Sequence, residues 1–272
     1  MAAPPREDAI HQTAAAALDV DGHVVLEVLG AAEAAALRTV VLDLVPDPNA
    51  TTFTDHRLAP AERQVLHGAI AEAVGAALEG AVPDHRIVAT SAIIKAPGEA
   101  SDLHWHLDPS ITDERRWRSL SAWIPLQDVG PSDGSLEVLT GGHRGAPPDR
   151  GGQGRFTETH PPHEVALAAC RGAGGRPSGP LVLAAGRAVL YDHRLPHRSG
   201  PNRGAHPRVA INVGLLPIDA PLLVHVWGDD DRVRAVPVTE RFFLDEDLAA
   251  DPRSWSTTDG AAGQPPPRPA RR

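Results

Sequence analysis

Hydrophobic and polar residues are patterned differently before and after about residue 86. Before it, the apolar positions predict helices over residues 31–45 and 60–80, after a short strand over 24–28. The second helix begins at a proline and ends at a glycine, which is the usual punctuation of a helix. Its apolar stripe is predicted to consist of Val65, Ile70, Val74 and Leu78. The first third of the chain is therefore expected to be largely helical.

Short apolar runs alternate with turn residues in the rest of the chain, which is typical of a sheet protein. The runs cover residues 86–97, 102–108, 119–129, 135–141, 180–186, 187–193, 208–217 and 222–228. Asp133 and Gly134 lie between two of them and suit a tight hairpin turn. Many short strands after a helical segment predict a mainly β fold, a β-sandwich or jelly roll with flanking helices.

The chain of 272 residues is long enough for one large domain with a full core. We expect a single domain over residues 1–251, interrupted by a long Gly/Pro-rich surface insertion at about 141–180 with a short helix at 164–170. Residues 252–272 have little apolar content and are predicted to form a disordered tail.

Charge and composition exclude several classes of protein. The net charge of −9 argues against nucleic acid or an anionic membrane as a partner. No apolar run reaches the roughly 20 residues of a membrane span, and the first residues lack the pattern of a secretory signal. The single cysteine, Cys170, forms no disulfide framework and is expected to be a thiol without chemistry. A cytoplasmic protein is the consistent interpretation.

Histidine is the obvious candidate for metal chemistry, because the chain has 14 histidines and one cysteine. In an extended strand His104, His106 and Asp108 share one face. A second polar cluster, with His197, follows another strand. His-x-Asp on one strand with a distant histidine is the pattern of the facial triad that binds Fe(II). Arg208 opens the next strand, where its guanidinium can pair with a carboxylate that also chelates the metal.

These motifs together resemble the phytanoyl-CoA dioxygenase (PhyH-like) family of Fe(II)/2-oxoglutarate-dependent oxygenases. The matching segments are DGHVVLEVLGAAEAAALR, LHWHLD, SAWIPLQDVGPSDGSLEVLTGGHRG, GRAVLYDHRLPHRSGPN and PRVAIN. Two turns depart from the family pattern, at Gly186-Arg187 and Gly141-Gly142-His143. The resemblance implies a double-stranded β-helix of the jelly-roll, cupin-like type.

The same resemblance implies the residues of the site. Fe(II) would be bound by His106, Asp108 and His197. The distal carboxylate of 2-oxoglutarate would be bound by Arg208 and Ser199, beside Trp123, with Lys95 as a further candidate contact. O2 would be the second co-substrate, and 2-oxoglutarate would be decarboxylated to succinate. Because position 108 carries a carboxylate, the resemblance favours hydroxylation of a C–H bond of a small molecule, such as a natural-product intermediate, over halogenation.

Alternatives stay open for both the function and the site residues. A cupin-type dioxygenase would use His104, His106 and His197 without 2-oxoglutarate, and a non-catalytic binding module would keep a metal for stability alone. His193 could replace His197 as a ligand, although the preferred interpretation of His193 is a strand histidine near the mouth of the barrel. The basic cluster of Arg115, Arg116 and Arg118 either binds an acidic substrate or is a run of charged residues exposed to solvent. Loop histidines at His143, His160, His163 and His206 are expected to be solvated, and the remaining histidines, among them His225, to be structural or on the surface.

Overall fold

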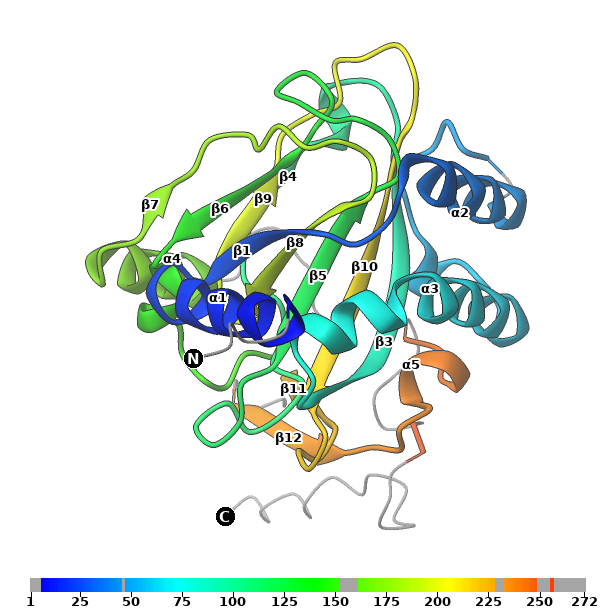
Figure 1. The fold of residues 1–272 in the computed structure, drawn as a ribbon. Coiled ribbons are helices and arrows are strands. Elements are labelled where there is room, and N and C mark those ends of the chain that lie inside the picture. Colours follow the sequence, from blue (N-terminus) through cyan, green and yellow to red (C-terminus); the bar gives the residue numbers. More distant parts are fainter. Residues whose placement is uncertain (1–5, 46, 152–160, 228–231, 249–254, 257–272) are drawn as a thin grey trace, which may run out of the picture.

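The computed structural model describes residues 6–45, 47–151, 161–227, 232–248 and 255–256 (Figure 1). Its helices are α1 (Arg6–Val20), α2 (Ala31–Leu44), α3 (Pro60–Ala81), α4 (Pro161–Gly172) and α5 (Phe242–Asp245), with short 3-10 helices η1 (Thr54–His56), η2 (Glu99–Ser101) and η3 (Gly142–Gly145). Its strands are β1 (His23–Glu27), β2 (Thr52–Phe53), β3 (His85–Lys95), β4 (Leu103–His106), β5 (Leu120–Pro125), β6 (Leu136–Thr140), β7 (Arg176–Pro177), β8 (Arg187–Asp192), β9 (His197–Ser199), β10 (Arg208–Pro217), β11 (Leu223–Trp227) and β12 (Val233–Pro237).

The strands form two antiparallel sheets that face each other, with a separate hairpin of β11 and β12. The major sheet has the order β1-β8-β5-β10-β3-β2, and the minor sheet has the order β4-β9-β6-β7. Helices α2, α3 and α5 lie beside β3 on one side of the molecule, and α4 lies next to the minor sheet on the other (Figure 1). The predicted mainly β fold with flanking helices, a jelly roll of the cupin type, is confirmed.

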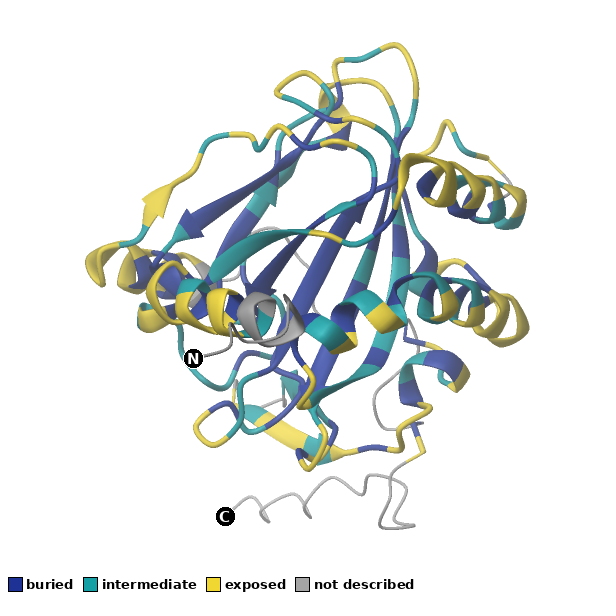
Figure 2. Ribbon diagram, viewed as in Figure 1, coloured by how far each residue is buried: buried dark blue, intermediate teal, exposed yellow. Residues whose placement is uncertain are grey.

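Successive side chains along the strands of the major sheet point to opposite faces, so the sheet separates two hydrophobic cores. Along β10, Val209, Ile211, Val213 and Leu215 face outward and pack with α2 and α3. Ala210 faces inward and packs with Trp123, Val189 and Tyr191, which lie on β5 and β8 of the same sheet, and with residues of the minor sheet. The central strands β5, β8 and β10 are mostly buried, while the outer surfaces of the helices are exposed (Figure 2). The interior between the sheets is therefore lined by residues at alternate positions.

The apolar stripe of α3 differs from the prediction by one position. Val65 is 58% exposed, whereas Leu66 is buried together with Ile70, Val74 and Leu78. A stripe at positions 66, 70, 74 and 78 repeats every four residues, which keeps the side chains on one helix face. Val65 lies one residue before that face and cannot reach the sheet.

Two predictions about the strand region were wrong. Residues 180–186 form no strand; only Leu183 makes a single bridge, to Val129. Proline and glycine at the two ends of this run leave too few residues for a ladder. The turn at Asp133-Gly134 joins no hairpin either, because β5 and β6 belong to different sheets. It carries the chain from the major sheet to the minor sheet.

The predicted insertion contributes to the minor sheet. The predicted short helix in it is part of α4, and β7 pairs with β6. Residues 152–160 of the insertion lie outside the described residues, as does the predicted disordered tail except for Trp255 and Ser256. Trp255 is buried, with its ring centroid 5.1 Å from that of Phe242. Among the described helices we find none with both the length and the apolar character needed to cross a membrane.

Candidate metal centre

His106, Asp108 and His197 converge at one end of the minor sheet. His106 is the last residue of β4 and is paired in the ladder with His197, the first residue of β9. Asp108 follows two residues after β4 ends, and its Oδ1 lies 3.9 Å from Nε2 of His106 and 3.7 Å from Nε2 of His197. The three ligand atoms lie within 4.8 Å of one another, and the described residues hold no second such group.

Both histidine rings are oriented by the backbone. Nδ1 of His106 donates a hydrogen bond to the carbonyl of His104 (2.8 Å), and Nδ1 of His197 donates to the carbonyl of Leu195 (3.1 Å). A carbonyl oxygen only accepts, so Nδ1 carries a proton, and in the neutral ring the lone pair is then on Nε2. A histidine held in this way presents Nε2 to a metal.

The protonation states suit metal binding. Desolvation and the neighbouring His197 lower the pKa of His106 to about 4. Burial by itself would raise the pKa of Asp108, but His197, His193 and His106 together hold it below its usual value. Near neutral pH the centre is therefore an ionised carboxylate with a neutral imidazole at His106, the form in which these groups bind cations.

His104 does not share the face of His106, which corrects the prediction from strand phase. Its side chain is 73% exposed, and its Nδ1 lies 3.0 Å from Oδ2 of Asp102. Between Leu103 and His106 the register of β4 against β9 shifts by one residue. Such a bulge breaks the two-residue alternation. The histidine pair that a cupin-type dioxygenase would need is therefore not formed.

His193 lies beside the centre with both ring nitrogens engaged. Ser121 Oγ lies 2.8 Å from Nδ1, and Nε2 donates to the carbonyl of Pro109 at 2.8 Å. Nδ1 lies 4.0 Å from Oδ2 of Asp108. His193 thus supports the segment that follows Asp108, and it has no nitrogen left to replace His197 as a ligand.

Arg208 and Trp123 lie on the inner face of the major sheet. Arg208 is buried at the start of β10, and its guanidinium carbon lies 5.3 Å from the centroid of the Trp123 ring. Its Nη1 and Nη2 make long hydrogen bonds to carbonyl oxygens, of 3.4 Å to Ile93 and 3.3 Å to Gly134, and its Nε is buried without an acceptor. Burial lowers the pKa of Arg208 to about 10. A buried guanidinium with weak partners can accommodate an anion.

Lys95 and Ser199 complete this cationic end of the interior. Nζ of Lys95 donates to the backbone carbonyls of Ser199 and Gly200, both at 2.7 Å, and to Ser199 Oγ at 2.6 Å. Because Ser199 Oγ accepts from Lys95, its own proton is free to be donated. Desolvation, followed by the charge of Arg208, lowers the pKa of Lys95 to about 7. The four residues Arg208, Trp123, Lys95 and Ser199 are called the anion pocket below.

Side chains that face the interior are less buried on β3 and β4 than on β5. On the inner face of β3, Ala89, Ser91 and Ile93 are half-buried, and on β4 the His106 side chain is 37% exposed. On β5 and β8, Trp123, Val189 and Tyr191 are buried, as is His197. Asn212 of β10 lies opposite Ser91 and Trp123 in the two ladders, and its Oδ1 is buried without a hydrogen-bond partner.

Several other predicted site residues have other surroundings. Arg115 pairs with Asp149, and Arg118 pairs with Asp19 and Asp192, so two of the three basic residues are engaged by carboxylates. His143, expected to be solvated, is buried against the turn at Gly22, whereas His206 is exposed. Cys170 is buried, and desolvation raises the pKa of its thiol to about 11, as expected for an inert cysteine. His160 and the His163 side chain lie outside the described residues.

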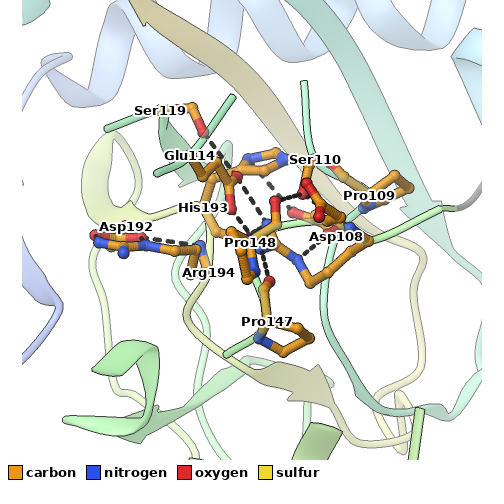
Figure 3. A network of polar contacts seen from close by, with 12 residues as sticks. Asp108, Pro109, Ser110, Glu114, Ser119, Pro147, Pro148, Asp192, His193 and Arg194 are labelled. Carbon is orange, nitrogen blue, oxygen red and sulfur yellow. Dashed lines mark hydrogen bonds and ion pairs between the residues drawn. The ribbon is translucent and has the colours of Figure 1, made fainter. Parts of the chain in front are cut away.

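Three buried residues surround the segment after Asp108, and sequence reasoning missed two of them, Arg150 and Glu114. Arg150 and Glu114 form a buried ion pair, and His225 donates from Nδ1 to the carbonyl of Ser110 at 2.7 Å. Figure 3 draws the polar contacts around this segment, with Asp108, Ser110 and Glu114 labelled. Arg150 and Glu114 belong to no periodic segment or motif, so the pattern of residues carried no signal for them. His225 lies in the predicted strand run 222–228 and was expected to be structural or on the surface.

The chain was compared with known proteins. The profile of the family "Phytanoyl-CoA dioxygenase (PhyH)" matches residues 8–210. No curated protein matches the chain.

Among solved structures, the alpha-ketoglutarate-dependent epimerase SnoN from nogalamycin biosynthesis is 20% identical, with a TM-score of 0.57 over 79% of this chain and 86% of that chain. The carbocyclase SnoK from the same biosynthesis is 18% identical, with a TM-score of 0.59 over 81% and 90% of the two chains. HygX from Streptomyces hygroscopicus, solved with nickel and 2-oxoglutarate bound, is 17% identical, with a TM-score of 0.53 over 76% and 87%. At these identities the likeness shows a shared fold.

Proposed function

The chain belongs to the phytanoyl-CoA dioxygenase (PhyH) family of Fe(II)/2-oxoglutarate-dependent oxygenases, and we propose that it hydroxylates a C–H bond of a small molecule. The observation that carries the proposal is the pairing of two sites inside one jelly roll. One is the group of His106, Asp108 and His197, and the other is the anion pocket around Arg208. The first suits a metal and the second suits a carboxylate.

The group of His106, Asp108 and His197 fits a ferrous ion. Two atoms bound to one ion at about 2.1 Å, the length of a metal–imidazole bond, can lie at most about 4.2 Å apart. The distances of 3.9 Å and 3.7 Å from Asp108 Oδ1 to the two Nε2 atoms satisfy this limit. They exceed the roughly 3.0 Å between two ligands at 90° on an octahedral ion, so the side chains would move closer together around a bound ion. Two imidazoles and one carboxylate are the ligands of the facial triad, which leaves further positions on the ion for co-substrates.

The anion pocket fits the distal carboxylate of 2-oxoglutarate. Arg208 Nε is buried without an acceptor, which is unfavourable unless a ligand supplies one. Arg208 would bind the carboxylate with its guanidinium, and Ser199 would donate its hydroxyl proton to the same group. Trp123 would line the pocket and keep water from the ion pair. Lys95 would hold Ser199 in place and add positive charge.

Bound Fe(II) with 2-oxoglutarate supplies oxidation of a C–H bond by O2, with 2-oxoglutarate decarboxylated to succinate. The residues of the chain have the task of binding, orienting and shielding. Asp108 stays ionised and His106 neutral near neutral pH, so these two ligands would bind a metal without first losing a proton. Val189, Tyr191 and Trp123 form a buried apolar layer that excludes water from this part of the interior.

The substrate is proposed to bind at the open side of the interior, next to β3 and β4. Ala89, Ser91 and Ile93 leave this side half-exposed and carry no charge. Asn212 Oδ1 can accept a hydrogen bond from a hydroxyl or amine of the substrate. A neutral small molecule with hydrogen-bond donors fits these walls. Because Arg115 and Arg118 are already paired, they give no support to an acidic substrate.

Release of succinate tests the proposal. Protein loaded with Fe(II) under anaerobic conditions is mixed with 2-oxoglutarate and O2, with and without a panel of small molecules, and succinate is measured. We expect slow succinate release that an accepted substrate increases, and loss of that release in Arg208→Met. A metal-loaded protein that forms no succinate with any of the compounds would contradict the proposal. Product formation that survives Arg208→Met would favour a dioxygenase that does not use 2-oxoglutarate.

A further inference from the structure

Three consecutive carbonyl groups beginning at Asp108 each accept a hydrogen bond from a buried side chain. Arg150 Nε donates to the carbonyl of Asp108 at 2.8 Å. His193 Nε2 donates to that of Pro109 at 2.8 Å, and His225 Nδ1 to that of Ser110 at 2.7 Å. Figure 3 shows Asp108, Pro109, Ser110 and His193 close together in this network. The three donors come from distant parts of the chain.

These hydrogen bonds replace a missing strand partner. β4 ends at His106, and residues 107–119 contain no helix or strand. Carbonyl groups of such a segment, when buried, must find partners outside a ladder. The direction of the Asp108 carboxylate depends on the backbone at Asp108, and Arg150 donates the hydrogen bond that holds the carbonyl of this residue.

Arg150 connects more groups than the other two donors. Its guanidinium donates to Glu114, to the carbonyl of Pro147 at 2.8 Å and to the carbonyl of His193 at 3.3 Å, besides that of Asp108. Its backbone carbonyl accepts from the backbone N–H of Ser110 at 2.8 Å. It thereby ties the segment after β4 to the segment after β8 and to the beginning of the predicted insertion.

Glu114 is the counter-ion that makes a buried arginine possible at this point. Oε1 of Glu114 accepts from Arg150 Nη2 at 2.8 Å and from Ser119 Oγ at 3.1 Å, and Oε2 accepts from Arg150 Nη1. The Glu114 side chain is 1% exposed and that of Arg150 is 6% exposed. A fork-to-fork pair with each oxygen bonded has a fixed geometry.

We propose that Arg150, with Glu114 as its buried counter-ion, is a positioning residue for the metal ligand Asp108. Arg150 fixes the backbone carbonyl of Asp108 and so the direction in which the carboxylate points. The beginning of the insertion is then part of the metal centre rather than a lid over it. This inference rests on the proposed metal site, and loss of such outer contacts typically weakens metal binding about 10- to 100-fold.

Metal affinity of the apoprotein is the test, with Co(II) as the probe. Arg150→Met alone leaves Glu114 buried without a partner and can unfold the chain, so the double variant Arg150→Met with Glu114→Gln is also made. Arg150→Lys keeps the positive charge but loses the two parallel hydrogen bonds of the guanidinium to Glu114. Asp149→Asn is the matched control. Asp149 is the residue before Arg150, and its ion pair is the exposed one with Arg115.

The readouts are the Co(II) dissociation constant, the visible spectrum of bound Co(II) and the melting temperature. We expect the double variant and Arg150→Lys to melt cooperatively, to bind Co(II) about 10- to 100-fold more weakly and to show an altered spectrum. Asp149→Asn should keep the affinity of the unmodified chain. Unchanged affinity and spectrum in either folded Arg150 variant would overturn the positioning role. Failure of the unmodified chain to bind Co(II) would instead overturn the proposed metal site.

Discussion

Lys95 and Arg208 lie opposite each other in the β3–β10 ladder, both buried, and no carboxylate among the described residues lies within ion-pair distance of either. Two uncompensated cations on one rung repel each other, and desolvation adds to the penalty. Such an arrangement is unfavourable for the free chain. It would become favourable with a dianion such as 2-oxoglutarate bound between the anion pocket and the proposed metal site.

The first prediction concerns Arg208→Met. The variant should bind 2-oxoglutarate about 10- to 100-fold more weakly, because a hydrogen bond to a charged group contributes roughly 1.5–3 kcal/mol. The ligand-free protein should melt no lower than the unmodified chain, since an apolar side chain replaces a poorly paired buried charge. Titration calorimetry and thermal melts measure the two effects. A lower melting temperature with unchanged 2-oxoglutarate affinity would show that Arg208 is structural.

The second prediction concerns the pH dependence of 2-oxoglutarate binding. The pKa of Lys95 is lowered to about 7 by desolvation and by Arg208, while Asp102 raises it and Arg198 lowers it further. Without ligand, Lys95 therefore loses its proton as the pH rises through 7. A bound dianion favours the charged amine, so binding above pH 7 takes up a proton.

The affinity for 2-oxoglutarate should therefore fall as the pH rises above 7, by at most about tenfold per pH unit. Dissociation constants measured from pH 6 to 9 check this trend. In Lys95→Met the dependence should flatten, with weaker binding at pH 6. An affinity independent of pH in the unmodified chain would be inconsistent with a role for the Lys95 charge.

The third prediction compares two histidines of one strand. His106→Ala should lower Co(II) affinity by at least about tenfold, because it removes a direct ligand of the proposed centre. His104→Ala is the matched control, since its ring is 73% exposed and pairs only with Asp102 among the described residues. Its metal affinity should stay within about twofold of the unmodified chain. Equal losses in both variants would revive the cupin-type ligand set.

The fourth prediction concerns Gly134, in the turn between the two sheets. Its φ is +63°, and an added Cβ would lie 2.6 Å from Lys95 Cδ and 2.7 Å from the carbonyl oxygen of Gly200. Gly134→Ala should lower stability by at least about 1–2 kcal/mol from the left-handed backbone alone. It should also weaken 2-oxoglutarate binding, because Lys95 must move.

Gly130→Ala is the control for Gly134→Ala. An added Cβ at Gly130 would meet only Asp133 Oδ2, at an ordinary 3.7 Å. Chemical denaturation and 2-oxoglutarate titration of the two variants separate backbone strain from a general effect of alanine in this turn. Equal stability of the two variants would contradict the role assigned to the Gly134 conformation.

The sequence by itself determined the fold class and the family, and it supplied the residues proposed for the metal and for 2-oxoglutarate. Alternating apolar residues define the inner and outer faces of strands such as β10, and His106, Asp108, His197 and Arg208 stand in a recognisable order along the chain. These signals are local, or depend only on the order of residues along the chain, so they can be recognised without knowledge of the tertiary packing.

Only the tertiary structure decided which neighbours share a face and what holds Asp108 in place. The bulge in β4 turns His104 to solvent, and a register shift of one residue depends on the partner strand β9 rather than on β4 alone. Arg150 and Glu114 are 36 residues apart and lie in irregular segments, where no periodicity marks an inward side chain. A buried charge is unfavourable without a partner of opposite charge, and only the folded structure shows which charged residues are buried.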